Sequence, residues 1–239
     1  MPFDHFHIEP SWQSPLAAAG LGSLEGLMRT QLGKCVSDHG RGQVIRIELA
    51  GGQVVFVKRD TFSPAMLKNA LADLCHLKSP RDPATREVEA IRRVASLGVR
   101  TPLPLAWGHR KFGPFPLQSV LVTAELTGKH LHIMLKYGAP RDEVRSALSW
   151  SGRTAGAIYR AGLSWPDLMP KHFFIEEESA GVLDLIRVHQ AKGPVATYMP
   201  AQVGRFCDKA RFFGTEEEDL AFFLEAMDYE GLLKRTGVS

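Results

Sequence analysis

The chain has 239 residues, of which 44% are hydrophobic and 23% are charged, and its formal net charge is +3. That composition is typical of a soluble globular protein and excludes a disordered chain, a collagen-like fibre and a disulfide scaffold. The small positive charge does not indicate a nucleic-acid partner. No apolar stretch approaches the roughly 20 residues that a membrane-spanning helix needs.

The amino terminus and the cysteines indicate a cellular compartment. The first ten residues, MPFDHFHIEP, contain no basic region followed by an apolar run, so no secretory signal is expected. The three cysteines, Cys35, Cys75 and Cys207, are odd in number and widely spaced, which favours reduced thiols. We therefore expect a cytoplasmic globular protein.

The first half of the chain is expected to be rich in strands. Residues 1–30 are rich in Gly, Ala and Pro and give no firm assignment. The apolar pattern of residues 43–59 predicts two strands joined by the turn Gly51-Gly52, with the second strand ending at Lys58. A glycine-bearing turn over residues 38–42 precedes the first of these strands.

One helix in this half has a clear start and stop. Asp82 is expected to cap it, Pro83 suits the first helical position, and Gly98 is the expected stop. Glu87 shares the inward side because positions 87, 91 and 94 follow the i, i+4, i+7 spacing, whereas Glu89 is expected to face solvent. The expected apolar stripe of this helix comprises Val88, Ile91, Val94 and Ala95.

A proline-rich connection, residues 101–104, and a strand, residues 119–125, complete the first half. A boundary near residues 126–130 then separates two lobes of different character. We expect residues 1–126 to form a β-rich lobe and residues 127–239 to form a mostly helical lobe.

The second half is predicted to begin with a long helix over residues 141–161. A loop over residues 165–172 follows this helix, and then come two short strands, the second of which ends at Asp184. The last clear helix is expected to begin at a capping box formed by Thr215 and Glu218.

Four ionisable residues lie at positions that suit phosphoryl transfer from ATP: Lys58, Glu87, Asp167 and Asp184. That reaction needs a cation on the donor phosphates, a carboxylate that holds this cation, a carboxylate at the attacking hydroxyl and another that binds magnesium. Each residue alone also has a structural explanation as a solvated strand-end lysine, a half-buried helix carboxylate or a turn aspartate. Their order along the chain is the order that protein-kinase-like folds use.

Several stretches of the chain resemble the Kdo/WaaP lipopolysaccharide kinase family. They are VVFVKR (54–59), TREVEAIRRVASLGV (85–99), VLVTAELT (120–127), AGLSWPDLMPKHFFI (161–175) and VLDLIRVHQAK (182–192). The most specific part is the D-x-x-x-x-H-F-[FL] segment followed by an L-D-L-x-R strand. The resemblance implies an α+β, bilobal protein-kinase-like fold, in which the β-rich lobe with one main helix binds the nucleotide and the helical lobe is catalytic.

The resemblance also implies a role for each site residue. Lys58 would contact the ATP phosphates and pair with Glu87, and Asp167 would accept or orient the proton of a sugar hydroxyl. Asp184 would chelate Mg²⁺. His172 stands where a generic kinase has Asn, at the second metal-side position.

Two features of this assignment leave alternatives. Imidazole is a poor magnesium ligand, so His172 has the alternatives of a hydrogen bond to Asp184 or to a phosphate, or of packing beside aromatic residues. The turn that contains Gly40 and Gly42 would lie over the ATP phosphates, although its glycine pattern is degenerate.

One departure from the family concerns the catalytic loop. Where the family has His-Arg-Asp, this chain has Trp165-Pro166-Asp167, which keeps the aspartate and loses two supporting residues. The expected function is an ATP-dependent kinase that phosphorylates a sugar hydroxyl of the lipopolysaccharide inner core, and the resemblance implies that the sugar is heptose. The alternatives are a small-molecule kinase of the aminoglycoside or choline type and a non-catalytic pseudokinase scaffold.

The expected acceptor is amphiphilic and anionic, so basic side chains would help to dock it at the cytoplasmic face of the inner membrane. An ordinary solvated surface is the alternative explanation for such side chains. Basic residues gather in two places: Arg86, Arg92 and Arg93, and again Arg205, Lys209 and Arg211.

Overall fold

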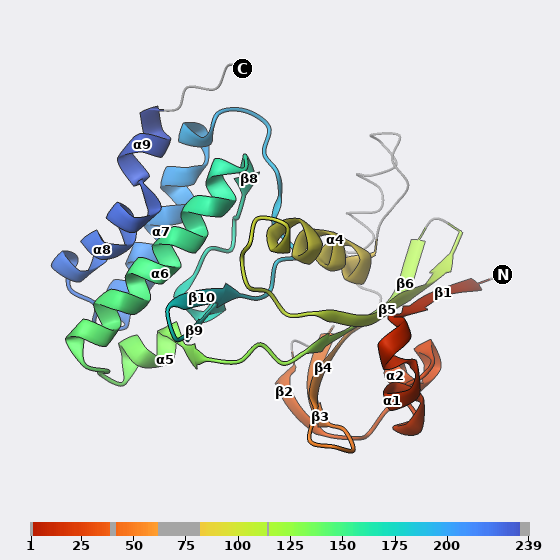
Figure 1. Cartoon of the computed structure of the whole chain (residues 1–239). Helices are drawn as coiled ribbons and strands as arrows, with labels where there is room; N and C mark the ends of the chain where they lie inside the picture. The colour runs from red at the N-terminus through yellow and green to blue at the C-terminus, as the bar shows by residue number, and fades with distance from the viewer. Residues whose placement is uncertain (1, 39–41, 62–81, 114, 235–239) are drawn as a thin grey trace. The chain divides into compact units, whose positions relative to one another are not determined.

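The computed structural model describes residues 2–38, 42–61, 82–113 and 115–234 (Figure 1). The chain divides into two compact units. Unit 1 comprises Met1–Glu89 and Pro102–Glu125, and unit 2 comprises Ala90–Thr101 and Leu126–Ser239.

Unit 1 is built on a six-stranded sheet of order β1-β5-β6-β4-β3-β2, in which all neighbouring strands are antiparallel. The predicted hairpin is confirmed as β3 and β4, and both turn glycines, Gly51 and Gly52, have the positive φ that such a turn requires. The strands are β1 (Pro2–Ile8), β2 (Lys34–Asp38), β3 (Gly42–Glu48), β4 (Val54–Thr61), β5 (Pro104–Phe112) and β6 (Phe115–Ala124).

The hydrophobic core of unit 1 lies on one face of this sheet. A 3₁₀ turn η1 (Pro10–Trp12) and two short helices, α1 (Gln13–Ala18) and α2 (Leu24–Arg29), occupy the region that the sequence left unassigned, and Figure 1 shows both helices against the sheet. Leucines of these helices pack with Val55 and Val57 of β4. Because side chains alternate along a strand, Lys58 points to the opposite face.

Several strand assignments in unit 1 differ from the predictions. Strand β4 continues past Lys58 to Thr61, and β6 begins at Phe115, earlier than expected. Strand β5 was not predicted, because residues 104–109 are all buried and therefore show no polar–apolar alternation. Its Gly108 and Pro104 also look like loop residues in the sequence.

Helix α4 (Pro83–Ala95) confirms the predicted helix. Val88, Ile91 and Val94 are buried as expected, and Glu89 is exposed. Ala95 is exposed instead of belonging to the apolar stripe, because the last helical residue lies on the solvent side. The helix crosses the division between the units, since Glu89 is the last residue of its unit 1 part.

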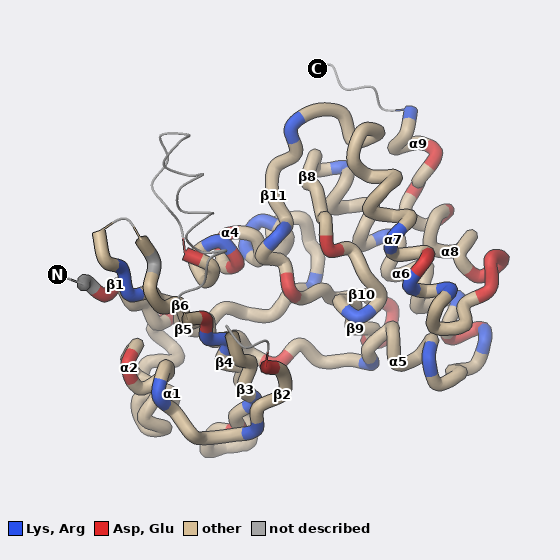
Figure 2. Tube along the Cα trace, turned by 180° about the vertical axis from the view of Figure 1, so that it is seen from behind, with Lys and Arg blue, Asp and Glu red and all other residues tan. Residues whose placement is uncertain are grey.

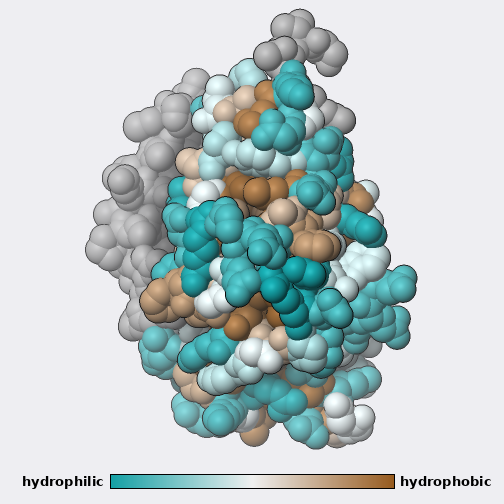
Figure 3. All heavy atoms as spheres, turned by 90° about the vertical axis from the view of Figure 1, so that its left-hand side faces the viewer, coloured by the Kyte–Doolittle hydropathy of each residue, from teal (hydrophilic) through white to brown (hydrophobic). Residues whose placement is uncertain are grey.

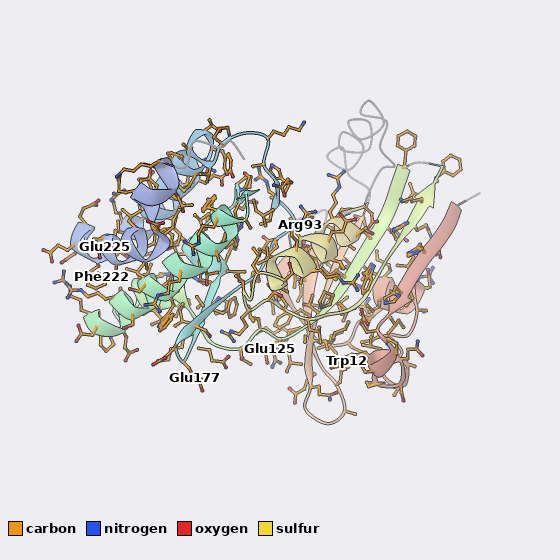
Figure 4. All side chains as sticks on the ribbon, turned by 45° about the horizontal axis from the view of Figure 1, so that its top comes forward. Trp12, Arg93, Glu125, Glu177, Phe222 and Glu225 are labelled. Carbon is orange, nitrogen blue, oxygen red and sulfur yellow. The ribbon has the colours of Figure 1, made fainter. Side chains whose placement is uncertain are left out.

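Unit 2 combines helices with two small sheets, of order β10-β9-β7 and β11-β8. Its first elements are β7 (Lys129–His130), α5 (Leu131–Lys136), α6 (Arg141–Arg160), β8 (Leu163–Ser164), η2 (Pro170–His172) and β9 (Phe173–Glu176). The remaining elements are β10 (Ser179–Val182), β11 (His189–Gln190), η3 (Val195–Thr197), α7 (Met199–Phe212), α8 (Glu217–Met227) and α9 (Tyr229–Lys234). Glu177, labelled in Figure 4, lies in the turn between β9 and β10.

Helix α6 confirms the predicted long helix and packs closely on α8. A Cβ atom at Gly152 would collide with the carbonyl oxygen of Phe223, and one at Gly156 would lie 2.6 Å from that of Met227. Near its start, α6 also forms ion pairs with residues before and within α8, where basic and acidic segments meet in Figure 2. Figure 3 shows hydrophilic residues around smaller apolar areas on the face of this unit turned to the viewer.

The carboxyl-terminal predictions need correction. The capping box is wrong, since α8 begins at Glu217 after Glu216 with no side-chain cap, and the Thr215 hydroxyl is buried without a hydrogen-bond partner among the described residues. Strand β10 ends at Val182, two residues before Asp184. Helix α7 was not predicted, because Gly204 weakens its helical pattern, although Pro200 suits its first turn.

We expect Gly152→Ala to lower the free energy of unfolding by about 1–2 kcal/mol, measured by urea denaturation. The added methyl meets the α8 backbone, and this overpacking exceeds the roughly 1 kcal/mol that alanine gains over glycine in a helix. Gly204→Ala in α7 is the matched control: no atom lies within 4 Å of its added Cβ, so this variant should be more stable than wild type. Equal effects of the two variants would contradict the close α6–α8 contact.

Candidate active site

Lys58 and Glu87 form an ion pair within unit 1. Strand β4 is an inner strand, and Lys58 on it lies between Val44 of β3 and Leu121 of β6. Its Nζ atom is 2.7 Å from Glu87 Oε2, and the Glu87 side chain is only 8% exposed. The Lys58 side chain is 28% exposed, so its ammonium is partly accessible to solvent.

The position of Glu87 depends on how α4 is anchored. Asp82 caps the helix as predicted, because its carboxylate accepts hydrogen bonds from the Thr85 backbone N–H at 3.0 Å and from the Thr85 hydroxyl at 2.7 Å. Ser119 of β6 joins the cap to the sheet. Its Oγ accepts a hydrogen bond from Ala84 N–H at 2.9 Å and donates one to Asp82 at 3.3 Å.

A histidine completes this buried anchor. His109 Nδ1 on β5 lies 2.7 Å from Asp82 Oδ2, and both side chains are nearly inaccessible to solvent. Burial by itself would raise the pKa of Asp82, but the interactions with His109 and Thr85 outweigh it and lower the pKa to about 2. Although Asp, His and Ser occur together, the serine contacts the carboxylate and not the imidazole, so this is not a hydrolase triad.

The two glycines predicted to lie over the ATP phosphates are Gly40 and Gly42. Gly40 lies outside the described residues. Gly42 is the first residue of β3 and pairs with Asp60, whose Oδ1 would be 2.5 Å from an added Cβ. The carboxylate of Asp60 would have to move to make room for a side chain at position 42.

In unit 2, the loop after β8 is held from α7. Trp165 is fully buried, and its backbone N–H donates to Gln202 Oε1 at 2.9 Å. The same oxygen accepts from the Tyr159 hydroxyl at 2.9 Å, and Gln202 Nε2 donates to Ser164 Oγ at 2.7 Å. One turn further along α7, Arg205 donates to the Pro166 carbonyl at 2.9 Å.

Asp167 and His172 are linked through the backbone of the loop. His172 Nδ1 lies 2.7 Å from the Asp167 carbonyl oxygen. A carbonyl can only accept, so Nδ1 carries the proton of this hydrogen bond. Burial lowers the pKa of His172, against the opposing attraction of Asp184, and the neutral ring then has its lone pair on Nε2.

Asp184 lies beside the other nitrogen of this ring. Its Oδ2 is 3.7 Å from His172 Nε2, and its side chain is 39% exposed. The backbone of Asp184 is left-handed, with φ of 58°, a conformation that is uncommon for a residue with a side chain and is often found at functional sites. The structure thus brings Asp167, His172 and Asp184 together within unit 2.

The donor set at Asp184 and His172 fits a magnesium ion that is held jointly with phosphates. Among the residues that the structure describes, no group of three His, Cys, Asp or Glu side chains forms a metal cluster. Magnesium is commonly bound by one or two carboxylates, with phosphate oxygens and water completing its shell. Asp184 is the stronger donor for this ion, since imidazole binds magnesium poorly.

Several residues that contact these clusters were not predicted to do so. Gln202 and Arg205 contact the loop from α7, which was not predicted, and His109 lies on the unpredicted strand β5. Arg187 donates to Asp167 Oδ1 at 2.7 Å. The only sequence signal for Arg187 is its place in the L-D-L-x-R strand.

The sequence model described as "Lipopolysaccharide kinase (Kdo/WaaP) family" matches residues 39–193, more than half of the chain. The chain belongs to this lipopolysaccharide kinase family. Its members are ATP-dependent phosphotransferases that act on lipopolysaccharide, so the predicted family and enzyme class are confirmed. No curated protein matches the chain.

Solved structures show the fold of this lipopolysaccharide kinase. "WaaP in complex with acyl carrier protein" is similar at a TM-score of 0.69 and 22% identity, covering 97% of this chain and 91% of that chain. The crystal structure of WbdD is similar at a TM-score of 0.51 and 14% identity, covering 82% of this chain and 44% of that chain. The predicted α+β, protein-kinase-like fold is confirmed. No helix among the described residues is both long and apolar enough to span a bilayer.

The buried anchor of α4 predicts a pH-dependent contribution to stability. The pKa of Asp82 is about 2 in the folded protein, below its ordinary 3.8, so the ionised carboxylate stabilises the fold above about pH 4 and this contribution is lost as the pH falls through 2. Asp82→Asn removes this titration. The difference in unfolding free energy between wild type and variant, measured by urea denaturation, should shrink by about 2 kcal/mol from pH 4 to pH 2. A difference that stays constant over this range would contradict the charged anchor.

Proposed function

We propose that this lipopolysaccharide kinase transfers the γ-phosphoryl group of ATP to a heptose hydroxyl of the lipopolysaccharide inner core. The observation that carries the proposal is the cluster of Asp167, His172 and Asp184, in which one ring joins two carboxylate-bearing segments. Phosphoryl transfer needs two such carboxylates, one at the acceptor and one at the metal. Heptose is the acceptor that the family resemblance implies.

Unit 1 is proposed to bind the nucleotide. The partly exposed ammonium of Lys58 would contact the ATP phosphates, and the buried carboxylate of Glu87 would keep it in place at 2.7 Å. Gly40 and Gly42 belong to the segment proposed to lie over the phosphates. In this assignment residues 1–126 are the nucleotide-binding lobe and residues 127–239 are the catalytic lobe.

Unit 2 is proposed to carry the chemistry. As the acceptor oxygen bonds to the γ-phosphorus and the bond to the ADP oxygen breaks, Asp167 takes the proton of the acceptor hydroxyl. Asp184, with His172 at the second metal-side position, would hold Mg²⁺. The ion, when bound, neutralises charge on the phosphate oxygens.

The Trp165-Pro166 departure is compatible with activity because other residues support the loop. Trp165 is buried and lies next to the His172 ring, with centroids 6.5 Å apart, and to Phe173. Gln202 and Arg205 hold the backbone on either side of Pro166. These contacts favour an enzyme over a scaffold that has lost its catalytic loop.

Contact with the cytoplasmic face of the inner membrane is proposed at the end of α7. Phe212 is 78% exposed there, and the ammonium of Lys209 lies 5.3 Å from its ring centroid. An exposed aromatic ring beside a cation suits the boundary between apolar chains and anionic headgroups. Such a surface would keep the enzyme near an amphiphilic acceptor.

The first experiment measures transfer of labelled phosphate from ATP–Mg²⁺ to purified lipopolysaccharide whose core has been dephosphorylated. We expect wild type to label the core heptose and Asp167→Ala to lose about two to four orders of magnitude in rate, because the proton acceptor is missing. The assay is run with and without acyl carrier protein, since a structurally similar protein was solved in complex with one. Labelling of aminoglycoside or choline instead would favour the small-molecule kinase.

Asp184→Asn separates metal binding from folding in the same assay. Asparagine tolerates the left-handed backbone of residue 184, so the variant should fold like wild type. Its turnover should fall, and it should need a higher Mg²⁺ concentration for half-maximal rate. An unchanged Mg²⁺ dependence would contradict the role of Asp184, and ATP binding without labelling of any acceptor would favour the scaffold.

Membrane contact is tested with sedimentation of anionic phospholipid vesicles. The double variant Lys209→Ser, Phe212→Ser should bind about fivefold or more weakly than wild type, because each cation near the surface contributes roughly 1 kcal/mol. Lys136→Ser, Tyr137→Ser is the matched control, since Lys136 lies 5.1 Å from the exposed ring of Tyr137 in α5 and its C-cap. Equal weakening by both double variants would contradict a docking surface on α7.

A further inference from the structure

Arg187 makes a direct ion pair with the proposed proton acceptor. Its Nη1 donates to Asp167 Oδ1 at 2.7 Å, and the Arg187 side chain is 60% exposed while that of Asp167 is 26% exposed. The pair is therefore accessible from solvent. An exposed ion pair of this kind contributes little to the free energy of unfolding, so stability does not explain why Arg187 contacts Asp167.

The backbone around Arg187 is fixed by short-range contacts. Val188 N–H donates to the Leu185 carbonyl at 2.8 Å, which closes a turn around Arg187, and both of these apolar side chains are buried. His189 Nδ1 lies 2.8 Å from the Arg187 carbonyl oxygen. The guanidinium is therefore presented from a defined turn.

Strand pairing places this turn beside the catalytic loop. In the β8–β11 ladder, Ser164 pairs with His189. The chain continues from Ser164 towards Asp167 and, on the other strand, leads back from His189 to Arg187. Because the two strands are antiparallel, Asp167, which follows Ser164, and Arg187, which precedes His189, lie on neighbouring backbones.

Arg187 supplies a positive charge that the loop around Asp167 lacks. Pro166 stands directly before Asp167 and can supply no cation. A guanidinium that binds one carboxylate oxygen restricts the rotation of the carboxylate and leaves the second oxygen for another partner. We infer that Arg187 is the positioning residue of Asp167: it holds Oδ1, so that Oδ2 is presented to the acceptor hydroxyl.

The inference rests on the proposed role of Asp167 and is tested by a double-mutant cycle in the labelled-phosphate assay. Arg187→Ala should lower kcat about a hundredfold, because a misplaced catalytic group costs about that much, and should leave KM for ATP unchanged. In the Asp167→Asn background, the same substitution should have no further effect. Added guanidinium ion should restore part of the activity of Arg187→Ala, but none of that of Asp167→Asn.

Thermal unfolding and a control variant separate positioning from a structural role. Arg187→Ala should change Tm by less than about 3 °C, as expected for loss of an exposed ion pair. Arg141→Ala is the control, because Arg141 also pairs with carboxylates, Glu216 and Asp219, at the start of α6 in unit 2. It should keep wild-type kcat.

Four results would overturn the inference. Wild-type kcat in Arg187→Ala would show that the ion pair is dispensable, while an equal loss in the Asp167→Asn background would show that Arg187 acts independently of Asp167. A large fall in Tm without guanidinium rescue would assign Arg187 a structural role. Wild-type turnover in Asp167→Asn would overturn both the proposed function of Asp167 and this inference. The other three results would overturn this inference alone.

Discussion

The ion pair between Lys58 and Glu87 constrains the arrangement of unit 1. The buried carboxylate of Glu87 is stabilised by the opposite charge of Lys58, and loss of the ammonium would remove that charge from it. The pair therefore requires that the apolar side chains of the inner strand β4 point to α1 and α2, so that Lys58 points to the opposite face. It also requires that α4 be held in the rotation that points Glu87 at Lys58. The Asp82 cap, tied to β5 and β6, meets the second requirement.

Unit 2 holds its carboxylates by different means. Neutral groups support the loop: a buried amide, a buried indole and an imidazole that donates to a backbone carbonyl. The charged contacts come from exposed arginines at the edge of the loop. In the proposed function, these accessible carboxylates would have to exchange partners during turnover, while the contacts of the loop backbone stay in place.

The elements predicted correctly have signals that are local in the sequence. The Gly51-Gly52 hairpin is specified by its turn residues, and α4 by its cap and its stop. Strand β5 was missed because burial on both faces removes alternation, and α7 because Gly204 lowers its helix propensity. The contact of Arg187 with Asp167 could not be foreseen, because it depends on the register of two strands of two residues each.

The sequence separations of these contacts differ greatly between the units. In unit 2, His172 contacts the backbone of a residue 5 positions away, and Arg187 contacts one 20 positions away. In unit 1, the ion pair of Asp4 with Arg110, on the paired strands β1 and β5, joins residues 106 positions apart. Closing the longer loop costs about 1.5 kcal/mol more chain entropy than closing the 20-residue one. The loop that carries Asp167 thus forms through short loop closures with a small entropy cost. The edge strand β1 pairs with β5 only through a closure that spans 106 positions.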